Sequence, residues 1–496
     1  MPISLSLANL DAISARAKIP GYSRNEITPG ILHFGIGNFH RAHQAVYLDR
    51  LFGLGLDRDW GLVGAGVTAH DSAMRGRLAQ QDYLTTVVEQ TAEATTIRVT
   101  GAMVDFLDPN DQAAIIAKLA DPAIRIVSMT ITEGGYFINP ASGEFDSGNP
   151  AILADAREPD NPGTVFGLIL AGIRRRRAAG IQAFTVMSCD NIPGNGHTTM
   201  KTVAGLARLS DPDLADWITD HMYFPNSMVD RITPATGKRE IENCRTQFDM
   251  DDRSPVYCEE FSQWVLEDRF SAGRPALEKV GVTFVDDVTP YELMKIRILN
   301  GSHASIAYAG ELLDIHFVHD AMSDPDIASF LRRLVHDDII PVVPPVPDTD
   351  MGDYFETVRV RFANPRIADT IARLAYDGSN RQPKFIVPAI RDALDMGGSI
   401  AGLALVSALW CRYCHGRMES GRRIDASDPV WDRLTEAASK ARANPLEWIG
   451  MRDIYGDLAS APEFVEAFST NLESLWENGT RATLSRYGSA RNRPSG

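Results

Sequence analysis

The sequence predicts an α/β fold in two parts: a parallel β-sheet with its helices over residues 1–286 and a mostly α-helical part over residues 287–496. Two observations predict it. In the first part, short apolar runs alternate with helical segments, which is the pattern of a parallel sheet. In the second part, apolar residues recur almost throughout at helical spacing. Loops are expected there at residues 341–353 and 378–383, and an amphipathic helix is expected over residues 464–476. A chain of 496 residues is long enough for two large domains with substantial cores.

The composition argues against several classes of protein. The 49 basic and 65 acidic side chains give a net charge of −16, which disfavours binding to nucleic acid or to an anionic membrane. No basic segment followed by an apolar core begins the chain, and its most apolar run, residues 400–410, is too short to cross a bilayer. Five scattered cysteines fit reduced thiols. We expect a cytoplasmic protein, either a monomer or a small homo-oligomer.

A strand, a glycine turn and a helix open the first part. Residues 31–34 are predicted to form the strand, the turn carries Gly35 and Gly37, and helix-forming residues continue through Leu48. Glycines at such a turn allow a pyrophosphate to approach the backbone closely at the helix N-terminus. His40 stands where the usual dinucleotide-binding motif has its third glycine. The motif alone therefore fits an ordinary tight turn as well.

Further buried strands are predicted in residues 61–67, 124–131 and 184–189, with helices such as residues 109–119 between them. This alternation places the glycine turn in a Rossmann-type sheet, where ligands bind beyond the carboxyl ends of the strands. Asn191 follows one of these strands. Its amide either donates to a substrate oxygen or caps the following turn.

The residue that binds the adenosine ribose should follow the second strand. Asp71 is the candidate at this place, after three residues that carry no acid. Residues 68–73 contain no arginine or lysine to accept the extra phosphate of NADP. The sequence therefore favours NAD as the cofactor.

The second part begins with residues 291–303, a run of helical pattern that carries polar groups among apolar ones. At about 100° per residue, Lys295, Asn300 and His303 fall within an arc of roughly 140°, and Glu292 lies about one turn before the lysine. A polar helix face in water explains this pattern equally well. However, apolar neighbours surround Lys295, and partial burial lowers the pKa of a lysine toward that of a useful general base.

Other charged residues are weaker candidates. Asp230 and Arg231 form a pair of the kind that is more often structural, and Arg373, Asp377 and Arg381 are candidate contacts for a hydroxyl-rich ligand. The residues from 411 to 415 have the Cys-x-x-Cys-His spacing of a c-type haem site, which requires export. No second pair of ligands lies near for zinc, so we expect no metal site.

Five ordered blocks resemble the polyol-specific long-chain dehydrogenases, namely residues 35–44, 130–136, 188–191, 229–234 and 295–303. The resemblance runs from about residue 30 to residue 385. It implies a metal-independent enzyme with an N-terminal Rossmann-type NAD-binding domain, residues 1–286, and a helical substrate-binding and catalytic domain, residues 287–496.

The resemblance also implies roles for individual residues. Lys295 matches the general base of the family, and Asn191 and Asn300 match the two asparagines that polarise the reacting oxygen. His303 matches a histidine that positions the substrate. Glu292 matches a glutamate that gates proton exchange between the base and the solvent.

Further matches concern the two ligands. Asp230 and Arg373 match residues that hold the distal hydroxyls, and Arg381 stands where the family commonly has lysine. That exchange is not conservative at a hydrogen-bonding site. The expected cofactor contacts are Gly35, Gly37, Asn38, Phe39, His40, Asp71 and Glu133.

The expected reaction is the reversible NAD-dependent oxidation of a polyol to a ketose, D-mannitol to D-fructose, with Lys295 as the base. Within the family, a D-arabinitol dehydrogenase or a reductase of a hexuronate (fructuronate or tagaturonate) is the alternative. The hexuronate would call for another cation at the distal end of the substrate. From a different class, a catalytically silent NAD-binding regulator is disfavoured by the intact set of lysine, histidine and two asparagines.

Overall fold

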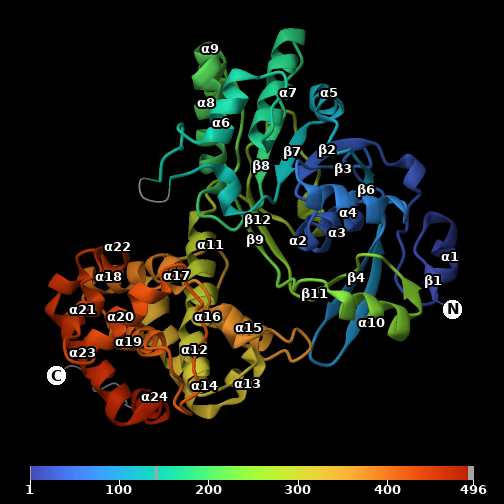
Figure 1. Cartoon of the computed structure of the whole chain (residues 1–496). Coiled ribbons are helices and arrows are strands. Elements are labelled where there is room, and N and C mark those ends of the chain that lie inside the picture. The colour runs from blue at the N-terminus through green and yellow to red at the C-terminus, as the bar shows by residue number, and fades with distance from the viewer. Residues whose placement is uncertain (1, 140–142, 490–496) are drawn as a thin grey trace. The chain divides into compact units, whose positions relative to one another are not determined.

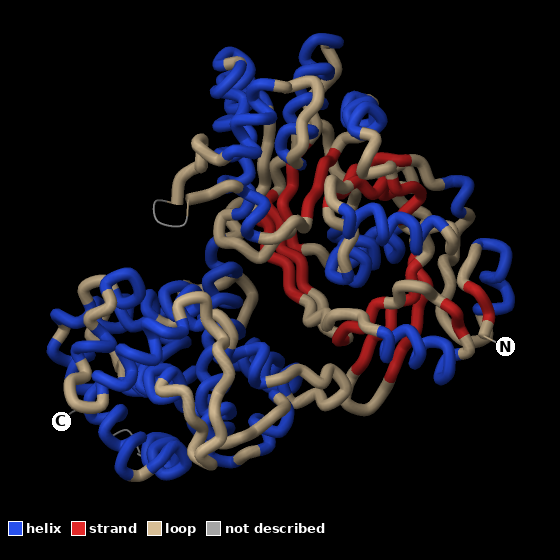
Figure 2. The backbone as a smooth tube through the Cα atoms, in the orientation of Figure 1, coloured by secondary structure: helices blue, strands red, loops and turns tan. Residues whose placement is uncertain are grey.

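The computed structural model describes residues 2–139 and 143–489. The chain divides into two compact units, Met1–Thr289 and Pro290–Gly496. All strands among the described residues belong to the first unit, and the second unit is built from helices (Figures 1 and 2). The predicted order of a sheet domain followed by a helical domain is confirmed.

A five-stranded parallel sheet organises the first unit, with the strand order β6-β3-β2-β7-β8. Its strands are β2 (Pro29–Phe34), β3 (Gly61–Ala65), β6 (Met103–Phe106), β7 (Ile126–Met129) and β8 (Thr185–Ser188). Four of these coincide with the strands that the apolar runs predict. Because all five run in the same direction, the turns that follow them meet at one edge of the sheet.

Both faces of this sheet are covered. Leu32 and Val127 pack against α5 (Gln112–Ala120), α7 (Val165–Ala179) and α8 (Asn195–Ser210). Ile31 and Ile126, one residue earlier on each strand, face the opposite way. They pack with α3 (Gln44–Gly53) and with β12 (Gln263–Glu267). Burial on both faces explains why the strands are almost continuously apolar.

Three smaller sheets and further helices complete the first unit. β11 (Val256–Glu259), β4 (Thr85–Gln90) and β5 (Thr95–Thr100) form one sheet, and β13 (Thr283–Val285), β12 and β9 (Ser227–Asp230) form another. β1 (Ile3–Ser4) pairs with β10 (Met250–Asp251). The remaining helices are α1 (Leu10–Ile13), α2 (Asn38–Ala42), α4 (Ala69–Ala79), α6 (Pro150–Arg157), α9 (Pro212–His221) and α10 (Lys238–Phe248).

The second unit packs around two buried helices. Every residue of α12 (Gly301–Leu312) is buried, as is all of α19 (Ala401–Cys414) after its first residue. A helix that is apolar all round belongs in a core, which accounts for the apolar run at residues 400–410. Among the described helices, none combines the length and the apolar character needed to cross a bilayer.

Further α-helices complete this unit. They are α11 (Thr289–Met294), α13 (Val318–Ser323), α14 (Pro325–Leu334), α15 (Met351–Phe362), α16 (Ile371–Ala375), α17 (Gly378–Phe385), α18 (Val387–Asp395), α20 (Trp431–Ala441), α21 (Leu446–Ile449), α22 (Arg452–Tyr455), α23 (Pro462–Glu477) and α24 (Gly479–Ser489). Two π-helical segments, Lys295–Asn300 and Val335–Ile339, continue α11 and α14.

A buried polar cluster lies beneath the glycine turn in the first unit. His33 on β2 contacts the hydroxyls of Ser128 and Thr130 at 2.7 and 3.0 Å, and its ring stacks on that of His40 at 3.7 Å. Burial lowers the pKa of His33 to about 3 and the pKa of His40 well below its usual value. Both imidazoles are therefore neutral in the folded protein near neutral pH.

The neutral state of His33 predicts a pH dependence of stability. Because its folded pKa of about 3 lies below the value of about 6.5 expected in the unfolded chain, its contribution is complete above pH 6.5 and is lost as the pH falls toward 3. Between pH 7 and pH 5 this single group should cost about 2 kcal/mol of the free energy of unfolding. His33→Gln should therefore lose about 2 kcal/mol less than the wild type over this interval in urea titrations.

His70 provides the matched control because it is exposed on α4. His70→Gln should follow the wild-type pH dependence. The interpretation is wrong if His33→Gln and His70→Gln show the same slope of unfolding free energy against pH.

Candidate functional site

The glycine turn lies at the carboxyl end of β2, against the end of β7. Gly35 has φ +90°, and an ideal Cβ atom there would lie 2.1 Å from the carbonyl oxygen of Thr130. The Thr130 hydroxyl donates to Gly35 O at 2.8 Å. Around Gly37, by contrast, the nearest atom to an ideal Cβ is Gly35 O at 4.0 Å. The fold itself thus requires glycine at position 35 but leaves space at position 37.

The side chains of Asn38, Phe39 and His40, which follow the turn, contact other parts of the protein. The Asn38 amide donates to Pro234 O and to the Thr236 hydroxyl, both at 3.1 Å. Phe39 stacks on His43, where the predicted continuous helix is interrupted between α2 and α3. His40 is buried, and its ring nitrogens find no hydrogen-bond partner among the residues that the structure describes. It fills the interior where the usual motif has a third glycine.

Asp71 completes a capping box at the start of α4. One carboxylate oxygen accepts hydrogen bonds from the backbone N–H groups of Val67 and Thr68 at 3.1 and 2.9 Å and from the Thr68 hydroxyl at 2.6 Å. The Thr68 hydroxyl in turn accepts from Asp71 N. These bonds fix a negative charge at the turn after β3. Binding of the ribose by Asp71 stays a prediction.

Asp190, which the sequence reasoning missed, organises the neighbouring turns. Its buried carboxylate accepts hydrogen bonds from the N–H groups of Ile131 and Thr132 at 2.9 Å each and from the Tyr136 hydroxyl at 2.6 Å. Burial raises the pKa of Asp190. Thr132 has φ +66°, a conformation that is unfavourable for a β-branched residue and needs such support. A carboxylate directly after a buried strand was the available signal.

The hydrogen bonds of Asp190 thereby join the two turns that carry the predicted site residues Asn191 and Glu133. Asn191 is its neighbour in the chain, and Glu133 follows Thr132; both side chains are exposed. Since β2, β7 and β8 are adjacent in the sheet, Gly35, Glu133 and Asn191 lie at the same carboxyl edge.

Asp230 ends strand β9 and is buried. The next residue, Arg231, anchors it. The guanidinium of Arg231 bonds to Glu89 at 2.6 Å and to Glu259 O, and it also donates to Ala42 O at the end of α2. As the sequence suggested for this Asp-Arg pair, the arginine has a structural partner. A buried charge of this kind is tolerated because it is paired and hydrogen-bonded.

In the second unit, the prediction of a regular α-helix over residues 291–303 is wrong for the central residues. Residues Lys295–Asn300 form a π-helix, in which Gly301 N donates to Ile296 O five residues earlier. The wider turn absorbs one additional residue, a distortion that is frequent at functional sites. Periodicity of 3.6 residues could not predict it. Lys295 and Glu292 are 7% and 9% exposed, which agrees with the burial expected for the lysine.

His303 lies on α12, with its ring stacked on Phe362 at 3.9 Å. Burial and three nearby guanidinium groups, those of Arg373, Arg381 and Arg361, lower the pKa of His303 well below its usual value. Its imidazole is therefore neutral and can exchange hydrogen bonds with hydroxyl groups. Arg361 was not among the residues predicted from the sequence.

Arg373 and Arg381 both have partners within this unit. Arg373 forms an ion pair with Asp369, donating to it at 2.6 Å, and Arg381 donates to Leu374 O. Arg381 belongs to α17, where the sequence suggested a loop. The helix contains Pro383 in its interior, and Asp377, which has a left-handed conformation, directly precedes its first residue.

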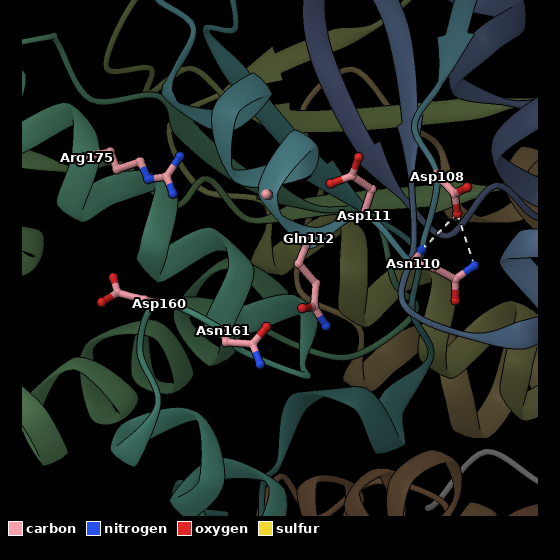
Figure 3. Close-up of a pocket in the computed structure, with 8 residues that line it drawn as sticks. Asp108, Asn110, Asp111, Gln112, Asp160, Asn161 and Arg175 are labelled. Atoms are coloured by element: carbon pink, nitrogen blue, oxygen red, sulfur yellow. Dashed lines mark hydrogen bonds between the residues drawn. The ribbon is translucent and has the colours of Figure 1, made fainter.

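Other features do not contribute to this site. A cavity of about 500 Å³ in the first unit is lined by Asp108, Asn110, Asp111, Gln112, Ala113, Asp160, Asn161 and Arg175 (Figure 3), none of them a predicted site residue. Cys411 and Cys414 are buried on α19, and burial raises the pKa of both thiols. Within residues 2–139 and 143–489, no group of three histidine, cysteine or acidic side chains is placed to hold a metal ion.

Comparison with known proteins covers nearly the whole chain. Residues 29–279 match the mannitol dehydrogenase Rossmann domain, and residues 287–476 match the mannitol dehydrogenase C-terminal domain. The mannitol 2-dehydrogenase of Cereibacter sphaeroides is 55% identical over 469 residues, which are 94% of this chain and 98% of that protein.

Two solved structures are similar throughout. The Pseudomonas fluorescens mannitol 2-dehydrogenase ternary complex with NAD and D-mannitol has a TM-score of 0.86 at 44% identity, covering 98% of this chain and 99% of that one. A D-sorbitol dehydrogenase in substrate-free form has a TM-score of 0.88 at 36% identity, covering 97% and 100%.

The two glycines of the turn should respond differently to substitution. Gly35→Ala places a methyl group against Thr130 O at a positive φ, so it should lower the melting temperature markedly or prevent folding. Gly37→Ala meets no such obstacle and should melt close to the wild type. If a pyrophosphate approaches this backbone, Gly37→Ala should nevertheless bind NADH more weakly, as measured by fluorescence titration. A Gly37→Ala variant with unchanged NADH affinity would contradict the predicted cofactor contact.

Proposed function

The chain belongs to the mannitol dehydrogenase family, and on this premise we propose that it catalyses the reversible, NAD-dependent and metal-independent oxidation of D-mannitol to D-fructose. The observation that carries the proposal is the similarity over nearly the whole chain to an enzyme solved with NAD and D-mannitol. Both units match together, and the lysine, histidine and two asparagines expected of such an enzyme are present. The first unit is assigned to the cofactor and the second to the substrate and catalysis.

The first unit suits a dinucleotide. The open backbone at Gly37 accommodates a pyrophosphate, since only Gly35 O lies near the position of a Cβ atom. Asp71 sets a negative charge after β3, which attracts ribose hydroxyls and repels the phosphate of NADP. Bound NAD supplies the hydride acceptor for the reaction. Glu133 and Asn191 follow the neighbouring strands at the same edge of the sheet.

The protein supplies the acid-base chemistry. Neutral Lys295 removes the proton of the C2 hydroxyl, and burial of the lysine (7% exposed) supports the neutral amine. The amides of Asn191 and Asn300 donate to the oxygen as negative charge develops on it. Glu292, one turn before Lys295, passes the proton to solvent. No Lewis acid is required by this scheme.

His303 and charged side chains hold the remainder of the substrate. The neutral His303 imidazole bonds to a substrate hydroxyl, while Asp230 and Arg373 hold the distal hydroxyls. Arg381 takes the position that is commonly lysine in the family. Its planar guanidinium favours a different hydrogen-bonding pattern, and this difference is proposed to tune the preference among mannitol, arabinitol and sorbitol.

A second candidate function is reduction of a hexuronate. The guanidinium groups of Arg361, Arg373 and Arg381 are close enough to His303 to lower its pKa, and a substrate carboxylate would pair with such a group. This alternative keeps the same lysine chemistry. The polyol is preferred because the similar proteins carry the names of polyol dehydrogenases.

The purified chain should oxidise D-mannitol with NAD and reduce D-fructose with NADH, with clearly lower efficiency on NADP. Activity should survive EDTA. The measurement is steady-state kinetics on mannitol, arabinitol, sorbitol, fructuronate and tagaturonate with both cofactors. Preferential turnover of a hexuronate would favour the second candidate, and NADH binding without any turnover would indicate a silent regulator.

Lys295→Ala should reduce turnover by about two to four orders of magnitude, because a general base is lost, while NADH affinity persists. Lys384→Ala is the control, since Lys384 is an exposed lysine of the same unit, and it should retain wild-type kinetics. Near-normal turnover of Lys295→Ala would refute the assignment of the base.

A further inference from the structure

We propose that Arg297 is a positioning residue for this reaction: its guanidinium holds the turn Lys295–Asn300 in the π-helical form that brings the base and the oxyanion amide onto one helix face. The inference rests on the proposed roles of Lys295 and Asn300. Arg297 lies within the turn but bonds away from it, to Val342 O and to the Asp392 carboxylate.

The π turn changes which side chains share a face. In a regular α-helix at about 100° per residue, Lys295, Asn300 and His303 span about 140°. A π turn absorbs one residue, so the residues after it stand as if one position closer to Lys295. Counted in this way, Asn300 stands four positions and His303 seven positions after Lys295. The arc of the helix surface that contains the three side chains therefore narrows from about 140° to about 60°. The distortion therefore aligns three groups that an α-helix would spread.

Such a turn needs support from outside, because π-helices are rare and occur mostly as single turns within α-helices. The second π-helix, Val335–Ile339, lies beside the end of the turn, since Ile339 Cδ1 is 3.7 Å from the position that a Cβ atom on Gly301 would take. Arg297 provides the polar part. Val342 belongs to the short 3₁₀ helix that follows the second π-helix, and Asp392 belongs to α18. Arg297 thus ties the turn to two other elements.

The chemistry of the anchor requires arginine. The Arg297 side chain is 9% exposed and that of Asp392 is 44% exposed, so the guanidinium is the buried partner. Its two terminal nitrogens bond in different directions, one to a carbonyl and one to a carboxylate. A lysine ammonium is a compact point charge and cannot reproduce this fork. Loss of either bond should allow the turn to relax toward the α-helical register.

The experiment compares Arg297→Met, Arg297→Lys and Asp392→Asn with the wild type. Arg433→Met is the control, because Arg433 forms an ion pair with Asp453 in the same unit with both side chains about half exposed. For each protein we would measure kcat and KM on mannitol, the pH profile of kcat/KM, NADH affinity and the melting temperature. An NMR titration of ¹³C-methylated Lys295 measures the pKa of the proposed base directly, without relying on catalytic turnover.

Arg297→Met should lower kcat by about 100-fold, the size expected for a small misplacement of reacting groups, with NADH affinity unchanged. Because water gains access to a loosened lysine, the acidic limb of the pH profile should move to higher pH. Arg297→Lys and Asp392→Asn should lose less activity in the same direction. Arg433→Met should match the wild type throughout.

An arginine that only stabilises the fold would lower the melting temperature without moving the pH profile or the titration of Lys295, and that result overturns the proposal. So does wild-type kcat in Arg297→Met. If Arg297→Met does not fold, the same measurements on Asp392→Asn decide whether the anchor positions Lys295 or only stabilises the fold. If the wild type oxidises no polyol, the proposed function fails instead, and the NMR titration alone decides whether Arg297 positions Lys295.

Discussion

The carboxyl edge of the parallel sheet depends on a backbone contact that leaves no room for a side chain. The carbonyl of Thr130 lies where a Cβ atom on residue 35 would stand. That approach joins the ends of β2 and β7, and the Thr130 hydroxyl bonds across it. The carboxylate of Asp190 then accepts hydrogen bonds from the backbone N–H groups of Ile131 and Thr132, in the turn after β7. The geometry of these turns therefore depends on the absence of a side chain at Gly35 and on the buried carboxylate of Asp190.

Both units place charges in the interior and satisfy them from distant parts of the chain. Arg231 pairs with Glu89, which is 142 residues away along the chain, and Arg297 pairs with Asp392, which is 95 residues away. Such bonds are electrostatically stronger in a low-dielectric interior than at the surface, and they offset the cost of removing the charges from water. The histidines beneath the glycine turn are instead kept neutral. Buried charges are thus paired, and the buried histidines beneath the glycine turn carry no charge.

The sequence predicts those elements whose signal is local. Apolar runs identify four strands of the sheet, and helical periodicity identifies α23 close to its observed bounds. The helix α17 is missed because Pro383 and Gly378 are turn signals that the tertiary structure overrides. Asp190 is missed because its partners lie 54 to 59 residues away. The π turn is missed because an added residue breaks the very period used to find helices.

The π turn also means that the length of this segment can change by one residue without dispersing the site. Loss of one codon between Lys295 and Asn300 would remove the absorbed residue and leave a regular α-helix, in which the asparagine follows the lysine by four positions and the histidine follows it by seven. Those are the spacings that the π turn imitates, so the three groups would keep their common face, and every helix after Gly301 could keep its packing. In related sequences, a one-residue gap at this place would therefore not by itself mark divergence in function.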